Sequence, residues 1–142
     1  MLNKIFHAQP MRIENYAEIY EMWSNIPGIG LSAADSEESI GRYLARNPKL
    51  SFIFYQNHKI VGTILCGHDG RRGYIHHTCV LPEYQGQNIG RLLVENALAE
   101  LKKQGIDKCH LFVFCDNEAG KSFWHRLGWE KRSDLLIYSK KN

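Results

Sequence analysis

The chain has 142 residues, 44% hydrophobic and 23% charged, which is ordinary usage for one globular domain, and we expect a single domain over residues 1–142. No apolar run reaches the ~20 residues that span a bilayer, and the segment MLNKIFHAQPMRIENY lacks the apolar core of a signal peptide, so we expect a cytoplasmic protein with no membrane partner. The net charge of +3 is small and its basic residues are scattered in pairs, which argues against a nucleic-acid partner.

The first third of the chain predicts a strand followed by two helices. KIFHA near residue 5 is typical of a short strand, and residues 16–23 carry apolar side chains at helical spacing. Asp35, with Glu38 three residues later, predicts a capping-box start for a second helix. Asn47-Pro48 ends that helix.

The middle of the chain predicts three antiparallel strands. The β-rich runs LSFIFYQ and KIVGTILCG are separated by the dipeptide NH, which is typical of a hairpin. HDGRRG then supplies an Asp-Gly turn into the run YIHHTCVL.

The remainder predicts helix, strand, helix and strand. YQGQNIGRLLVENAL opens with glycines and amides and becomes an amphipathic helix that ends at Gly105. KCHLFVF is typical of a strand, residues 117–127 of a short helix, and LLIYS of a final strand. No repeat or linker divides the chain.

The glycine-rich opening of the first of these helices predicts an anion site. Backbone N–H groups that converge at a helix start, with glycines that let bulky groups approach, favour phosphate through roughly half a positive charge. Gly90 is followed by Arg91 and Leu92, which excludes the Gly-Lys-Ser/Thr of a P-loop, and the three-glycine dinucleotide fingerprint is missing.

The surrounding segment VLPEYQGQNIGRLLVENAL resembles the pyrophosphate-binding segment of the GNAT superfamily of acetyl-CoA-dependent N-acetyltransferases. That family shows the pattern V-x-P-x-[Y/F]-[R/Q]-G-x-G-[I/L]-[G/A]. The positions in register are Val80, Pro82, Tyr84, Gln85, Gly86, Ile89 and Gly90. Asn88 replaces the central glycine; because Asn tolerates a left-handed backbone and is a good N-cap, we expect the loop to keep its shape.

The resemblance extends over most of the chain. DNEAGKSFWHRLGWEKR is similar to the family's second landmark, an Asn followed by a short helix that ends in [Y/W]-x-x-x-G-[F/W], here with Asn117, Trp124, Gly128 and Trp129. The resemblance implies the GNAT fold, an α/β (α+β mixed) architecture with a central, mostly antiparallel sheet of six to seven strands and about four helices. It also implies acetyl-CoA as the cofactor and allows a homodimer.

The resemblance further implies the residues that bind acetyl-CoA. Backbone groups of Thr78, Cys79 and Val80 would pair with the pantetheine arm as if it were an added strand, and Asn117 would touch the cofactor. The pyrophosphate would be wrapped by Gln85, Gly86, Gln87, Asn88, Ile89 and Gly90, with Arg91 following at the helix start.

Acetyl transfer needs an uncharged amine, a polarised thioester carbonyl and a stabilised thiolate. A backbone N–H of the YIHHTCV strand can polarise the carbonyl. Some members of the resembled family carry a histidine base where this chain has His76, and a pKa near 6.5 suits that role; packing within the sheet is the alternative role for His76. Strand alternation predicts His76 on one face with Thr78, and His77 on the other.

The proton donor differs from the family pattern. Many members place a Tyr where this chain has Trp124, and an indole cannot protonate a thiolate. Expelling an unprotonated thiol at pH 7 costs about 2 kcal/mol, which slows the reaction without abolishing it. Tyr84, Ser122 or a water can give the proton, with Trp124 beside the sulfur; alternatively Trp124 is a core aromatic with Phe123.

We therefore expect an N-acetyltransferase that moves an acetyl group from acetyl-CoA to a primary amine, of a small molecule or a peptide, by direct attack in a ternary complex. The alternative is a catalytically weak or inactive CoA-binding module. The acidic loop 35–38 would favour a cationic acceptor and the basic turn 69–72 a carboxylate, so the acceptor stays open.

The cysteines predict neither disulfides nor a metal site. Cys66, Cys79, Cys109 and Cys115 include no C-x-x-C pair, and we expect buried free thiols. A zinc site formed with histidines of adjacent strands is the remaining alternative, but strand neighbours rarely converge tetrahedrally without a tight spacing motif.

Overall fold

A computed structural model of the chain describes residues 8–142. The chain divides into two compact units, one ending at Phe112 and the other spanning Val113–Asn142, and each is described by itself. The strand expected at KIFHA lies, apart from Ala8, outside the described residues. Within them, no helix combines the length and apolar character needed to cross a membrane.

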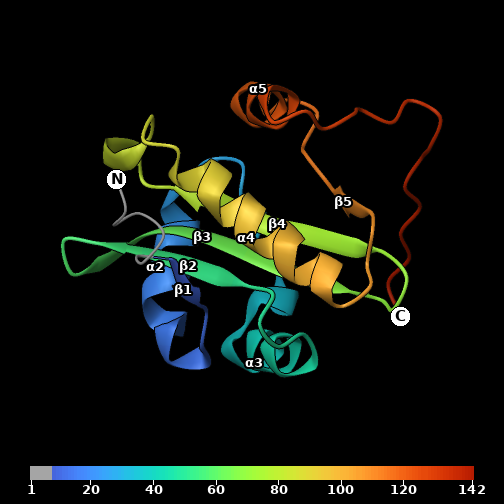
Figure 1. Cartoon of the computed structure of the whole chain (residues 1–142). Helices are drawn as coiled ribbons and strands as arrows, with labels where there is room; N and C mark the ends of the chain where they lie inside the picture. Colours follow the sequence, from blue (N-terminus) through green and yellow to red (C-terminus); the bar gives the residue numbers. More distant parts are fainter. Residues whose placement is uncertain (1–7) are drawn as a thin grey trace. The chain divides into compact units, whose positions relative to one another are not determined.

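The first unit is built on a five-stranded sheet in the order β1-β2-β3-β4-β5 (Figure 1). The strands are β1 (Ala8–Pro10), β2 (Phe52–Gln56), β3 (Lys59–His68), β4 (Gly73–Val80) and β5 (Cys109–Leu111). β1 to β4 pair antiparallel, and β5 runs parallel to β4. The mostly antiparallel sheet is confirmed, with five strands in residues 8–142 where six to seven were expected.

Four α-helices accompany the strands, as expected. They are α2 (Tyr16–Asn25), α3 (Glu37–Arg46) and α4 (Ile89–Lys103) in the first unit and α5 (Glu118–Arg126) in the second; three short 3-10 helices are η1 (Ile13–Asn15), η2 (Ala33–Asp35) and η3 (Pro82–Tyr84). In the first unit, α4 covers one face of the sheet and α2 and α3 the other (Figure 1). Two glycines of β3 show how closely these helices approach the strand. A Cβ atom added at Gly62 would lie 3.1 Å from the side chain of Leu93 of α4, and one added at Gly67 would lie 2.7 Å from the side chain of Tyr43 of α3.

Trp23 is the centre of the core on the α2 side of the sheet. Its side chain is fully buried, and its Nε1 donates a hydrogen bond to Thr63 Oγ1 of β3 at 3.0 Å. Buried polar atoms need such partners, so this bond fixes α2 against the sheet. The buried neighbours in this cluster include Ile19, Met22, Ile40, Ile53, Leu65 and Cys79.

The hairpin predicted at the dipeptide NH is confirmed. Asn57 and His58 have φ angles of 54° and 62°, the left-handed conformation that a two-residue type I′ turn requires at both central positions. Asn57 Nδ2 also donates to the hydroxyl of Tyr84 at 3.0 Å, which ties the hairpin tip to η3.

The predicted start of the second helix is wrong by one residue. Ser36 is the N-cap of α3, with its Oγ accepting from Ser39 N at 3.2 Å. Asp35 instead ends η2, where its carboxylate accepts from the backbone N–H of Ser32. Ser and Asp cap helices about equally well, so the local pattern could not choose between them.

The final strand predicted at LLIYS is also wrong. Leu135 to Tyr138 belong to no strand of the described structure, and their side chains are 56% to 89% exposed. A strand exists only where its backbone groups find a partner, and apolar β-propensity does not supply one.

We expect Leu93→Ala to destabilise the protein by about 2–5 kcal/mol, because Leu93 is fully buried between α4 and the sheet and its loss leaves a cavity. Leu136→Ala is the matched control: Leu136 is 82% exposed, and its loss should change the free energy of unfolding by less than about 0.5 kcal/mol. Urea unfolding measures both. Equal effects would contradict the packing described for α4.

Candidate functional site

Strand β4 carries one extra residue opposite β3. Leu65 pairs with His76 and Thr63 pairs with Cys79, so three steps along β4 face two steps along β3. Within this bulge His77 has a φ of 45°, in the left-handed region that few residues other than glycine adopt.

The bulge overturns the expected alternation of side chains. His77 was predicted on the face opposite His76, but its ring packs on Trp23 of α2, with centroids 4.6 Å apart, while His76 faces Tyr43 of α3 at 6.3 Å. Both rings therefore lie on the α2–α3 side. Cys79 returns to that side, where its Sγ lies 3.6 Å from the sulfur of Met22. The prediction failed because successive side chains of a strand alternate between the two faces only while the pairing is regular, and the added residue of a bulge interrupts that alternation.

Beyond the bulge, one edge of β4 has no strand beside it. β5 accompanies β4 only over Gly73–Ile75, so within residues 8–142 the segment His76–Val80 pairs with β3 alone. We call the side of His76–Val80 that faces away from β3 the open edge. Backbone groups on such an edge can pair with an extended molecule. Thr78, Cys79 and Val80 lie on this segment, where the sequence predicted pairing.

The open edge leads directly into the start of α4. Leu92 N donates to Asn88 O, so the amides of Ile89, Gly90 and Arg91 precede the first bond of the helix. Asn88 has a φ of 66°, which confirms the left-handed backbone expected for it, although its side chain caps no described amide. We call Gln85–Arg91 the anion loop.

Two contacts hold the anion loop against its neighbours. Gln85 Nε2 donates to the carbonyl of Val80 at 3.1 Å, which joins the loop to the end of β4. The ammonium of Lys59, at the base of the β2–β3 hairpin, lies 5.4 Å from the ring centroid of Tyr84. Arg91 is exposed at the start of α4 and adds positive charge to the end of the loop.

Two side chains of the segment His76–Val80 carry polar atoms that are shielded from solvent. The hydroxyl of Thr78 is buried and has no hydrogen-bond partner among the described residues. Burial raises the pKa of Cys79 to about 11, so its thiol keeps its proton at neutral pH. An orphaned buried hydroxyl marks a place where a bound group can add a hydrogen bond.

His76 is held neutral by its surroundings. Burial lowers the pKa of its imidazole, and the neighbouring His77 lowers it further, while Asp35 acts in the opposite direction. A neutral imidazole can accept a proton near pH 7.

Asn117 and Trp124 belong to the second unit. The Oδ1 of Asn117 accepts from Gly120 N at 2.9 Å and caps α5. Trp124 packs edge-on against Phe123 at 4.9 Å and Trp129 at 5.0 Å. His76, Tyr84, the open edge and the anion loop all belong to the first unit, whereas Asn117 and Trp124 have the local roles of a cap and an aromatic cluster in the second.

Sequence reasoning missed the partner of His77. Its Nε2 lies 2.7 Å from Asp35 Oδ1, a contact between residues 42 positions apart that no local pattern announces. The charges proposed for acceptor recognition are engaged as well: Glu38 pairs with Arg42, and Arg72 pairs with Asp107. Asp35 is therefore an internal residue and no part of an acidic surface loop.

The cysteines are free thiols that differ in burial. Cys66 and Cys79 are buried free thiols as expected, whereas Cys109 is half-buried and Cys115 is exposed. Among residues 8–142, no group of three or more His, Cys, Asp or Glu side chains is arranged to hold a metal ion.

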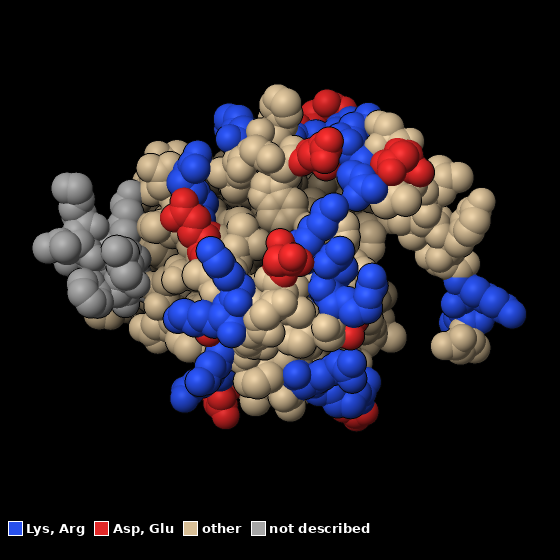
Figure 2. Space-filling model, turned by 45° about the vertical axis from the view of Figure 1, so that its right-hand side comes forward, with Lys and Arg blue, Asp and Glu red and all other residues tan. Residues whose placement is uncertain are grey.

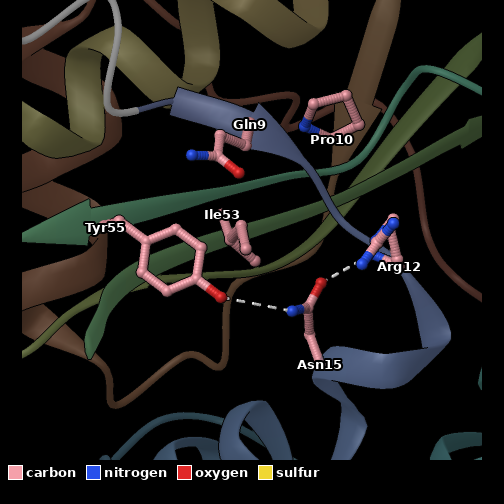
Figure 3. A pocket seen from close by; sticks show the side chains of 6 residues that line it. All are labelled: Gln9, Pro10, Arg12, Asn15, Ile53 and Tyr55. Carbon is pink, nitrogen blue, oxygen red and sulfur yellow. Dashed lines mark hydrogen bonds between the residues drawn. The ribbon is translucent and has the colours of Figure 1, made fainter. Parts of the chain in front are cut away.

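Two further features of residues 8–142 are the charge distribution on one face and a cavity beside the sheet. Lys and Arg alternate with Asp and Glu over the face shown in Figure 2. A cavity of about 350 Å³ lies beside β1 and β2 (Figure 3), lined by Gln9, Pro10, Arg12, Asn15, Ile53 and Tyr55. The amide of Asn15 already bonds the Tyr55 hydroxyl and the backbone N–H of Arg12, so these polar groups are satisfied within the protein.

Comparison with known proteins identifies relatives of this chain and structures with a similar fold. The acetyltransferase (GNAT) family matches residues 16–129. An acetyltransferase of Sodalis glossinidius is 28% identical over 92% of this chain and 91% of its own, and N-alpha-acetyltransferase 30 of Schizosaccharomyces pombe is 32% identical over 73% and 76%. The PaiA N-acetyltransferase of Thermoplasma acidophilum, solved with coenzyme A, superposes with a TM-score of 0.70 at 21% identity, covering 87% of this chain and 88% of that one.

We expect Asn88→Gly to leave both stability and coenzyme A affinity nearly unchanged, because Asn88 needs only its left-handed backbone and its side chain caps no described amide. Asn88→Val should cost about 1–2 kcal/mol and weaken coenzyme A binding, since a β-branched residue resists that conformation. Calorimetric titration with coenzyme A and thermal unfolding measure the pair. Equal affinity in the two variants would contradict the anion loop.

We expect His76 to make stability fall in mild acid. Its folded pKa lies below its unfolded value of about 6.5, so the unfolded chain binds more protons as the pH drops below that value. The contribution is therefore fully present above pH 6.5 and is lost as the pH falls through the folded pKa. Urea unfolding at pH 7.5 and 5.5 should show a smaller loss for His76→Gln than for the wild type; an equal loss would place the titration elsewhere.

Proposed function

Because the chain belongs to the acetyltransferase (GNAT) family, we propose that it transfers an acetyl group from acetyl-CoA to a primary amine by direct attack of the amine in a ternary complex. Enzymes of this family use acetyl-CoA and acetylate amines. When bound, acetyl-CoA supplies an activated acetyl thioester, and the residues of the first unit meet its two chemically distinct parts.

The continuity of the open edge with the anion loop carries this proposal. An extended amide-containing arm suits the backbone of Thr78–Val80. A diphosphate suits the amides of Ile89–Arg91, which precede the first helical bond of α4. The partnerless hydroxyl of Thr78 offers a further hydrogen bond. The same connected segment therefore provides backbone groups for the extended arm of acetyl-CoA and then backbone amides for its diphosphate.

We assign the base role to His76. Its lowered pKa keeps the imidazole neutral near pH 7, so it can take the proton that the attacking amine loses, directly or through a water. Its place at the first residue of the open edge puts it beside the proposed pairing segment. A backbone N–H of the same segment polarises the carbonyl.

The proton for the leaving sulfur comes from Tyr84 or from water in this proposal. The hydroxyl of Tyr84 accepts from Asn57 at 3.0 Å and keeps its own hydrogen to donate. Trp124 lacks a useful acidic proton and packs within its aromatic cluster, so we assign it no acid role. The acceptor class is a small-molecule or peptide amine.

A CoA-binding module without catalysis is the rival function, motivated by Trp124 in the place of a tyrosine. We expect wild-type protein to release free thiol steadily from acetyl-CoA when an amine from a diverse panel is added, and His76→Ala to lower kcat by about 10²-fold or more at neutral pH. His125→Ala is the control, because His125 is exposed on α5. Acetyl-CoA binding with no turnover over the whole panel would establish the rival instead.

A further inference from the structure

Asp35 and His77 form a buried contact between two segments far apart in the chain. His77 Nε2 lies 2.7 Å from Asp35 Oδ1, and the two side chains are only 13% and 9% exposed. An ionised carboxylate accepts hydrogen bonds and cannot donate them, so Nε2 carries the hydrogen of this bond. The contact joins η2, immediately before α3, to the bulge of β4.

The backbone of His77 is held by a second set of bonds. Thr63 Oγ1 donates to the carbonyl of His77 at 2.9 Å and accepts from Trp23 Nε1 at 3.0 Å. The ring of His77 also packs edge-on against Trp23. Because Thr63 and Trp23 are fully buried, the bulge is attached to the most rigid part of the core.

These contacts act against a backbone preference. A φ of 45° is unfavourable for histidine, which lacks the freedom of glycine, so His77 does not adopt it on local grounds. Residues held in such conformations persist only where the surroundings over-determine them. The hydrogen bond from the His77 side chain to Asp35 and the hydrogen bond from Thr63 to the His77 carbonyl hold His77 in this conformation.

Asp35 is itself anchored on two further sides. Its Oδ2 accepts from Ser32 N at 3.0 Å, and its backbone carbonyl accepts from the hydroxyl of Tyr16 at 2.7 Å. Tyr16 begins α2, so Asp35 is fixed to both η2 and α2. The carboxylate is a rigid attachment point and does not behave as a mobile surface charge.

We propose that Asp35 and His77 are positioning residues for acetyl transfer, which tie the β4 bulge to η2 and thereby fix the backbone of His76–Val80. The inference rests on the proposed function and extends it beyond the groups that touch the ligand. Neither side chain has to contact a substrate, because the effect runs through the backbone that follows the bulge.

The strain lies next to the segment that the proposed function assigns both to pairing with the extended arm of acetyl-CoA and to polarising the carbonyl. His77 directly precedes Thr78–Val80 on the open edge, and a misplacement of about 1 Å there can cost about 10²-fold in rate. None of the bonds described here involves the anion loop. Because the anion loop stays intact, loss of the tie should lower kcat by a larger factor than it raises the KM for acetyl-CoA.

Two substitutions of His77 separate the bond from the backbone. His77→Gln places an amide N–H near the position of Nε2 and can keep the hydrogen bond to Asp35. Gln tolerates a positive φ no better than histidine does. His77→Asn tolerates the left-handed backbone but is too short to reach the carboxylate. Steady-state kinetics with acetyl-CoA and the best amine of the panel, thermal unfolding and amide hydrogen exchange are measured for both.

The tie predicts that His77→Gln keeps kcat within about 3-fold, and that His77→Asn loses about 10- to 100-fold in kcat with a smaller change in the KM for acetyl-CoA. Amides of His76–Val80 should exchange faster in His77→Asn, in the absence of any ligand. Asp35→Ala should reproduce the loss, and the double variant Asp35→Ala/His77→Asn should lose no more than either single change.

The opposite ranking would overturn the inference: if His77→Asn keeps its kcat and its slow exchange, only the backbone conformation matters and the bond does not. Additive losses in the double variant would also overturn it, since the two residues would then act separately. Wild-type protein without amine-dependent turnover would overturn the proposed function and this inference together, whereas active wild type with an active His77→Asn variant overturns this inference alone.

Discussion

The extra residue in β4 is the constraint on which the candidate site depends. A regular β4 would alternate its side chains to Val80 and offer β5 a straight edge for pairing along its length. The bulge at His77 increases the local twist and coincides with the end of the β4–β5 ladder at Ile75. The open edge therefore begins where the bulge begins and where the short strand β5 ends.

The anion loop depends on that same strand for its position. Gln85 bonds the carbonyl of Val80, and η3 occupies the few residues between strand and helix, so the amides ahead of Leu92 start close to the point where β4 ends. Lys59 and Asn57 approach Tyr84 from the hairpin. The start of any helix favours anions. Here the position of β4 determines which part of a ligand bound along the open edge can reach the start of α4.

Local chemistry determined what the sequence could predict. The left-handed NH turn, Asn88 at positive φ and the four helices follow from residues within a few positions of one another. The bulge, the Asp35–His77 contact and the missing strand at Leu135–Tyr138 depend on partners far along the chain. Side chains along a strand point to the two faces of the sheet in turn. A bulge residue that no local pattern indicates therefore exchanges the two faces for every later residue.

Asp35 shows why charges in a loop are weak evidence for a substrate. Its sequence neighbourhood suggested an acidic face for a cationic amine, yet its carboxylate is bonded to His77 and Ser32 inside the protein. Glu38 and Arg72 are likewise paired with Arg42 and Asp107. Opposite charges a few ångströms apart cancel most of their field beyond a Debye length. Of the charges that suggested an acceptor, these three are thus committed to partners within the protein.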